Sequence, residues 1–201
     1  FDLDMDMDLA ERMVMHIVAN VLEKNLPELE LLERDIELLK GIKLPFPRIT
    51  YEEAIQILQR NDFPVKWGED FGGDEETVIS NEFSSPVMIH RYPAEVKAFY
   101  MKNDPHRPDV VLNVDMIAPE GYGEIIGGGQ REDDYTTLLN KINEHKLQVE
   151  PLQWYVDLRK YGTVPHAGFG LGIERTVAWI CGLKHVRETL PFPRLIDRLY
   201  P

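Results

Sequence analysis

The segment at residues 168–175 constrains this chain most strongly, because it reads Gly-Phe-Gly-Leu-Gly-Ile-Glu-Arg. Alternation of glycine and apolar residues predicts a strand, and the amphipathic run at 176–182 predicts a helix after it. Glycines leave one face of such a strand without side chains, which sacrifices packing within the sheet. A flat ligand could then lie directly on the backbone, with Arg175 placed to cover it or to hold its phosphate. The spacing differs from the dinucleotide fingerprint Gly-x-Gly-x-x-Gly, because the third glycine comes one residue early.

A second motif, at residues 115–132, combines two acids with the run Gly-Gly-Gly-Gln-Arg. The residues before Asp115 predict a strand, the glycines after it allow a turn, and an extended run resumes at Glu124. We therefore expect Asp115 and Glu124 on adjacent antiparallel strands, where paired carboxylates suit a hard cation such as Mg²⁺. Arg131 then offers a planar fork for a carboxylate, amide or phosphate oxygen.

Each motif also has a plainer interpretation. The first could be a glycine-rich strand crossed closely by another segment of backbone, and the second an acidic hairpin with a surface arginine. Paired acids followed by three glycines and an arginine are a poor match to ordinary hairpin chemistry. Together the two motifs favour a binding site.

Both glycine segments, with their acids and arginines, resemble the class II aminoacyl-tRNA synthetases. Residues 170–175 match the third signature motif of that class, which ends in an invariant arginine. Further matches point to the aspartate, asparagine and lysine subgroup, and within it to members specific for asparagine; they lie at 93–101, 123–128, 161–166 and 191–194. The resemblance extends essentially from Phe1 to Pro201.

The resemblance implies an α+β fold, an antiparallel sheet flanked by helices, as in the class II catalytic domain. The order of predicted elements agrees, because strands and helices do not alternate as parallel β-α-β units. We expect residues 1–201 to be the C-terminal part of that domain, with about 44–85 as an insertion. The first two class II motifs and the N-terminal anticodon-binding β-barrel are not recognised in the chain.

The resemblance also assigns roles to single residues. It implies ATP as cosubstrate with Mg²⁺, and Asp115 and Glu124 as the metal ligands. The catalytic residues would be Glu124, Arg131 and Arg175. The larger expected sets are Glu124, Ile125, Gly170, Gly172 and Arg175 for ATP, and Lys97, Gly128, Arg131 and Gly168 for the amino acid.

The implied function is activation of asparagine by ATP and its transfer to tRNA(Asn), by a cytoplasmic homodimer. The net charge of −13 argues against this chain alone holding RNA, so tRNA is expected to bind mainly through an N-terminal part. The single cysteine excludes a disulfide within the chain, and the absence of a long apolar run predicts no membrane partner.

Several alternatives stay open at this stage. An arginine fork at Arg131 suits an aspartate carboxylate as well as an asparagine amide oxygen, so an aspartate-specific synthetase is one alternative. An asparagine synthetase derived from this family, which uses aspartate, ATP and ammonia, is another. The third is a non-catalytic binding module.

Overall fold

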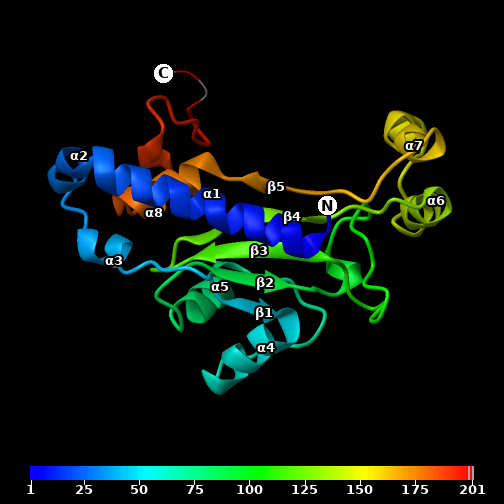
Figure 1. The fold of residues 1–201 in the computed structure, drawn as a ribbon, viewed down its shortest axis with the longest axis horizontal. Coiled ribbons are helices and arrows are strands. Elements are labelled where there is room, and N and C mark those ends of the chain that lie inside the picture. Colours follow the sequence, from blue (N-terminus) through cyan, green and yellow to red (C-terminus); the bar gives the residue numbers. More distant parts are fainter. Residues whose placement is uncertain (199, 201) are drawn as a thin grey trace.

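The computed structural model describes residues 1–198 and 200 of the chain. One five-stranded sheet forms its centre (Figure 1), and the strands lie in chain order: β1 (Arg48–Thr50), β2 (Val87–His90), β3 (Asn113–Ala118), β4 (Gly123–Gln130) and β5 (Ala167–Leu171). From β2 to β5 the pairing is antiparallel, as expected. The pair β1–β2 is parallel and departs from that expectation. Two helices connect these strands, and such a crossover is what parallel neighbours require.

Helix α1 (Leu3–Lys24) runs along one face of the sheet (Figure 1). Its N-terminus is capped by the Asp2 side chain, which accepts a hydrogen bond from the Met5 amide at 2.9 Å. Buried apolar residues recur every three or four positions, as a one-sided helix requires; they are Leu3, Met7, Ala10, Val14 and Val18. They form the main core with side chains of β3 and β4 and with Trp179 of α8 (Ile173–Cys181).

The opposite face of β1, β2 and β3 is covered by α4 (Tyr51–Arg60) and α5 (Gly73–Ser80). Thr50 and Glu53 form the capping box that their spacing predicts at the start of α4. This face has a separate core around Tyr51, Ile79 and Ile117. The segment 44–85 thus supplies a strand of the central sheet as well as two helices, and its interpretation as an insertion stays a prediction.

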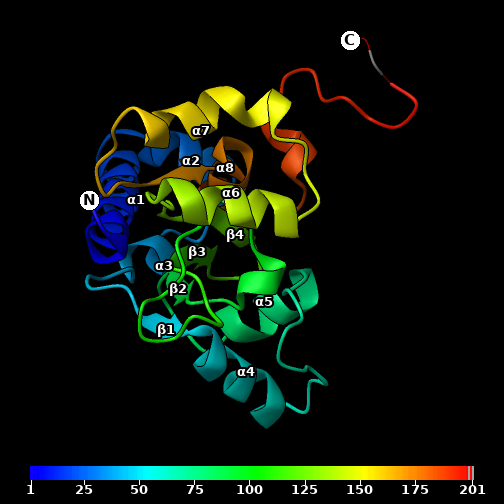
Figure 2. The same cartoon turned by 90° about the vertical axis from the view of Figure 1, so that its right-hand side faces the viewer.

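Two further helices, α6 (Tyr135–Glu144) and α7 (Gln153–Lys160), stack on each other beyond one end of the sheet (Figures 1 and 2). Leu138, Ile142 and Val156 form the small core between them. The remaining helices are α2 (Leu26–Leu31), α3 (Ile36–Lys40) and the 3₁₀ turns η1 (Ala94–Val96), η2 (Glu150–Leu152) and η3 (Val186–Thr189). Within residues 1–198 and 200, no helix has both the length and the apolarity that crossing a membrane requires.

Candidate active site

The site is arranged by a β-bulge between β3 and β4. Met116 pairs with Ile126 and Ile117 pairs with Glu124, so Ile125 is the extra residue. Ile125 and Ile126 therefore both face the core under α1. As a result, Glu124 lies on the same face as Gly127, opposite α1.

On that face, Asp115, Gly127 and Gly170 form a row across three strands, because Gly127 pairs with both of the others. A Cβ atom added to Gly170 or to Gly168 would meet no atom within 4 Å. The apolar residues between them, Phe169 and Leu171, pack against the core under α1. The strand β5 thus has an apolar face and a bare, open face, as the alternation in the sequence predicts.

Carboxylates gather at the start of β4. A Cβ on Gly127 would lie 2.6 Å from Glu124 Oε1 and 3.8 Å from Asp115 Oδ1, so both acids border this glycine. Burial, together with the charges of Asp115 and Glu76, raises the pKa of Glu124 to about 7. Burial also raises the pKa of Asp115, although the Lys97 ammonium opposes it. The structure therefore brings the two predicted metal ligands together in a place that favours a cation.

Lys97, predicted to bind the amino acid, reaches into this carboxylate cluster. Its ammonium lies 2.8 Å from Asp115 Oδ2, 3.1 Å from Asp70 Oδ1 and 4.0 Å from the centre of the Tyr92 ring. Burial disfavours the charge of Lys97, but Asp115 and Asp70 outweigh this effect and raise its pKa. Lys97 therefore stays charged and partly neutralises the acids around it.

Arg175 lies at the same end of the site, in the first turn of α8. Its Nη1 donates to the Glu124 carbonyl oxygen at 2.9 Å, and its side chain is exposed above the sheet. Glu76 of α5 accepts a hydrogen bond from the Glu124 amide at 3.0 Å. The predicted ATP residues Ile125 and Gly172 also meet, because the Gly172 amide donates to the Ile125 carbonyl at 2.9 Å.

Arg131 lies at the other end of β4, seven residues after Glu124, or roughly 20 Å by the rise of a strand. Its Nη2 donates to the Gly168 carbonyl at 3.0 Å, and its guanidinium lies 5.0 Å from the centre of the Tyr100 ring. The open glycines of β5 connect the two ends. The arrangement suits an elongated ligand with phosphates near Glu124 and a small polar group near Arg131.

Gly128 differs from the other predicted glycines. A Cβ there would lie 2.5 Å from Phe169 Cβ and 2.8 Å from the Gly168 carbonyl oxygen. Its missing side chain therefore lets β5 pack closely against β4, on the face away from the open floor. A role of Gly128 in amino-acid binding stays a prediction. Its contact with β5 is a close approach of two backbone segments, which is the plainer interpretation of a glycine-rich strand.

Sequence reasoning missed Glu76 and Asp70, which approach the site from the segment between β1 and β2. Their surroundings in the sequence are rich in acids and indicate an ordinary solvated surface. The capping pattern of α5 marks a helix start, yet it does not say which acid of the first turn points at the sheet. Tyr100, beside Arg131, belongs to a matching motif in the sequence, but that motif alone assigns it no role.

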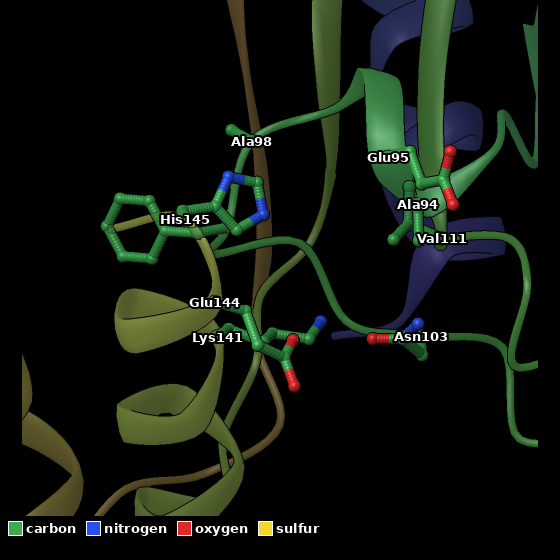
Figure 3. Close-up of a pocket in the computed structure, with 9 residues that line it drawn as sticks. Ala94, Glu95, Ala98, Asn103, Val111, Lys141, Glu144 and His145 are labelled. Carbon is green, nitrogen blue, oxygen red and sulfur yellow. The ribbon is translucent and has the colours of Figure 1, made fainter. Parts of the chain in front are cut away.

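The protein also has a cavity of about 380 Å³ between η1 and α6 (Figure 3), and none of the predicted site residues lines it. Glu95, Lys141, Glu144 and His145 give it mixed charge. The acids of the described residues form no cluster of three or more metal-ligating side chains. The carboxylate pair at Gly127 offers two oxygen donors, and Mg²⁺ sites that also use phosphate and water typically take one or two carboxylates from a protein.

Comparison with known proteins places this geometry in a family. The chain is 60% identical over 201 residues to the asparagine–tRNA ligase of Desulforamulus reducens, and covers 47% of it. It is 59% identical to the asparagine–tRNA ligase of Sorangium cellulosum and covers 48% of that protein. The chain thus spans about half the length of the curated relatives that it matches.

Solved structures of the same group of enzymes also match the chain. The asparaginyl-tRNA synthetase of Pyrococcus horikoshii complexed with asparaginyl-adenylate matches the whole chain with a TM-score of 0.97 and 52% identity, over 46% of that structure. The aspartyl-tRNA synthetase of Entamoeba histolytica matches with a TM-score of 0.88 and 25% identity, over 42% of its length. The family model of the class II tRNA synthetases for D, K and N matches residues 1–196, and the chain therefore belongs to this family.

Proposed function

We propose that this chain forms the floor of a site in which asparagine is activated by ATP and then transferred to tRNA(Asn). The observation that carries the proposal is the open glycine floor between Glu124 and Arg131, in a chain so similar to a synthetase solved with asparaginyl-adenylate. That ligand joins an amino acid to a nucleotide. Its elongated shape fits a site with phosphate-binding groups at one end and an arginine fork at the other.

In the first step, a carboxylate oxygen of asparagine bonds to the α-phosphorus of ATP, and the bond to the pyrophosphate leaving group breaks. The attacking carboxylate is already ionised, so the step needs no general base. Catalysis then depends on alignment and on charge stabilisation of the phosphoryl oxygens. Gly168 and Gly170 leave room for the ligand to lie against β5, and Arg175 would contact the nucleotide.

The chemistry of the carboxylates fits Mg²⁺. Asp115 and Glu124 are hard oxygen donors, and a cation would offset both effects that raise the pKa of Glu124, its burial and the charge of Asp115. Mg²⁺ held there would neutralise phosphate charge. Lys97 already neutralises part of Asp115, so Glu124 is the freer of the two ligands.

Arg131 would bind the side-chain carbonyl of the amino acid through its guanidinium, after giving up its bond to the Gly168 carbonyl. Asparagine is favoured over aspartate because the matched asparaginyl-tRNA synthetase structure is 52% identical and the aspartyl-tRNA synthetase structure 25%. In the second step, the terminal ribose of tRNA attacks the activated carbonyl and releases AMP. We also propose a homodimer in the cytoplasm, with most of the tRNA bound by regions outside this chain.

The proposal is tested by exchange of labelled pyrophosphate into ATP, with asparagine and aspartate supplied separately. The chain and a protein of the relatives' full length are compared, because the chain spans only half of them. We expect the full-length protein to exchange with asparagine only, and Arg131→Ala to abolish the exchange. Arg107→Ala, a change at an exposed arginine outside the site, is the matched control.

Exchange with aspartate alone would move the assignment to an aspartate-specific synthetase or to an ammonia-using asparagine synthetase. Exchange with neither amino acid would favour a binding module. Light scattering of the same preparation measures whether it is a dimer.

A further inference from the structure

Arg159, near the end of helix α7, is a buried arginine without a carboxylate partner. Its side chain lies in the interior, with 6% of the residue exposed. In the part of the chain that the structure describes, Arg159 forms no ion pair with an Asp or Glu side chain within 4.0 Å. Arg34, which is comparably buried, is paired with Glu120. A buried charge normally has such a partner, so the neutral surroundings of Arg159 call for an explanation.

All three guanidinium nitrogens of Arg159 donate hydrogen bonds to neutral groups. Its Nε donates to the Glu132 carbonyl oxygen at 2.9 Å, and its Nη1 donates to the Tyr155 carbonyl at 3.2 Å. Its Nη2 donates to the Tyr155 hydroxyl at 2.9 Å, and the guanidinium lies 4.0 Å from the centre of the Tyr155 ring. A lysine could not make this set of bonds, because its donors all share one nitrogen.

The Arg159 Nη2 also faces the imidazole of His166, whose Nε2 lies 3.5 Å away. The other ring nitrogen, Nδ1, lies 2.8 Å from the Val164 carbonyl oxygen. A carbonyl oxygen only accepts, so Nδ1 carries the ring proton and Nε2 is the acceptor that faces Arg159. Arg159 thus contacts two segments that are separate in the sequence: the residue that follows Arg131, and the residue that precedes β5.

Arg131 lies between these two segments. Its amide donates to the His166 carbonyl at 2.9 Å, and Met101 pairs with it in an isolated antiparallel bridge. Its neighbour Glu132 supplies the carbonyl that Arg159 binds. Arg159 therefore holds the main chain next to Arg131 and also the segment to which the Arg131 amide is bonded.

Helix α7 has few other polar connections to the sheet. It stands beyond the end of the sheet (Figures 1 and 2), and its apolar residue Val156 packs in the small core with α6. Across the described residues, the side-chain hydrogen bonds from α7 to other elements all come from Arg159. One side chain therefore makes the polar link between this helix and the amino-acid end of the glycine floor.

We propose that Arg159 is a positioning residue for Arg131: by fixing the two segments on either side of Arg131, it sets where the Arg131 guanidinium meets the amino-acid side chain. This inference rests on the proposed function for the identity of that amino acid. A residue that only stabilised α7 would affect the amino acid and ATP alike. A positioning residue affects the amino acid alone, because Glu124 and Arg175 lie at the other end of the floor.

The test is pyrophosphate exchange by a protein of the relatives' full length, with the KM values for asparagine and for ATP measured separately. Arg159→Leu should raise the KM for asparagine about tenfold or more, since a binding group misplaced by about 1 Å can cost about a hundredfold in rate. The KM for ATP should stay near that of the unsubstituted protein. Arg159→Lys keeps the charge but not the fork, and should behave like Arg159→Leu.

Lys160→Ala is the matched control, because it removes an exposed cation from the next position of the same helix. It should leave both KM values unchanged. An equal rise of both KM values in Arg159→Leu, or an unchanged KM for asparagine, would overturn the proposal. An unchanged KM for asparagine in Arg159→Lys would assign the effect to charge and would overturn it as well. If Arg159→Leu does not fold, Tyr155→Phe replaces it: loss of the hydroxyl that Arg159 binds should raise the KM for asparagine by a smaller factor, and no rise would overturn the proposal.

A second readout needs no activity. Deuterium uptake measured by mass spectrometry should rise in residues 129–132 of Arg159→Leu, because the Arg131 amide loses its fixed acceptor, while residues 87–90 of β2 keep their protection. Unchanged uptake at 129–132 would overturn the positioning role. If the unsubstituted full-length protein exchanges with neither amino acid, the proposed function fails, and this uptake alone decides whether Arg159 holds Arg131.

Discussion

The glycines of β4 and β5 all lack a side chain, but they have two different roles. At Gly170 the space above the backbone is open, whereas at Gly128 it is filled by the neighbouring strand. The sequence shows both positions only as glycines in extended segments, and the alternation at 168–172 concerns β5 alone. Which face is open and which is packed depends on the neighbouring elements.

This difference predicts opposite outcomes for two alanine substitutions. Gly128→Ala places a methyl group against Phe169 Cβ at 2.5 Å and should destabilise the fold by about 1–3 kcal/mol. Gly170→Ala meets nothing within 4 Å, so its urea midpoint should be close to that of the unsubstituted chain, while its affinity for ATP falls. Urea unfolding and calorimetric titration with ATP measure the two effects. Equal urea midpoints for the two variants would contradict the assignment of the faces.

Glu76 predicts an electrostatic effect on its neighbour. Its charge contributes to the raised pKa of Glu124, so Glu76→Gln should lower that pKa from about 7. The matched change Asp74→Asn, in the same turn of α5, should have a smaller effect, because Asp74 is not among the groups that shift Glu124. Carbon NMR of the glutamate carboxyls measures the titration. An unchanged Glu124 pKa in Glu76→Gln would show that the charge of Glu76 does not act on the Glu124 carboxyl.

At the scale of elements, the loop between α2 and α3 is fastened to the turn between β3 and β4 and to α8 by Arg34. Its guanidinium forms two hydrogen bonds to Glu120, of 2.8 and 2.6 Å, and its Nε donates to the Ile180 carbonyl near the end of α8 at 3.1 Å. Gly182, which ends α8 with φ of +68°, leaves room for the Arg34 side chain. Arg34 therefore joins three elements that are far apart in the sequence.

Arg34→Ala should lower the free energy of unfolding by about 2–4 kcal/mol, because a buried arginine is removed and a partly buried carboxylate loses its partner. Lys40→Ala removes an exposed ion pair with Glu37 and should change the free energy of unfolding by less than about 1 kcal/mol. Unfolding by guanidinium chloride, followed by tryptophan fluorescence, measures both free energies of unfolding. A loss in Arg34→Ala no larger than in Lys40→Ala would mean that this linkage contributes little.

Most elements could be predicted from the sequence, because their periodicity is local. The alternation at 168–172 and the spacing of apolar residues in α1 each belong to one continuous segment. The parallel pairing of β1 could not be predicted, since a three-residue strand carries too little pattern to fix its direction. The same holds for Asp70 and Glu76, because Asp70 reaches the site from the loop before α5 and Glu76 from α5 itself, through tertiary packing and not through neighbours in the chain.

For the molecule as a whole, acid stability should depend on His90 at the end of β2. Burial, with a smaller effect of the Arg91 charge, lowers the pKa of His90 from 6.5 to about 4. In the folded protein the His90 imidazole then stays unprotonated down to about pH 4, whereas in the unfolded chain it takes up a proton below pH 6.5. Stability from this group is therefore present above pH 6.5 and is lost as the pH falls towards 4.

His90→Gln should reduce the loss of unfolding free energy between pH 6.5 and 4 by about 2 kcal/mol, allowing for partial exposure of the ring. His16→Gln, at an exposed position on α1, is the control and should leave the slope unchanged. Urea unfolding at several pH values gives the slope. The same slope in both variants would assign the acid sensitivity to other groups.

The bulge at Ile125 makes the backbone path of β4 as important as its composition. Glu124 and Gly127 are three positions apart, and in a strand of strict alternation such residues point to opposite faces. Without the bulge, the same residues would therefore carry Glu124 to the apolar side of the sheet under α1, away from Asp115. The shared face of the two acids is thus a property of the extra residue between them as much as of the acids themselves.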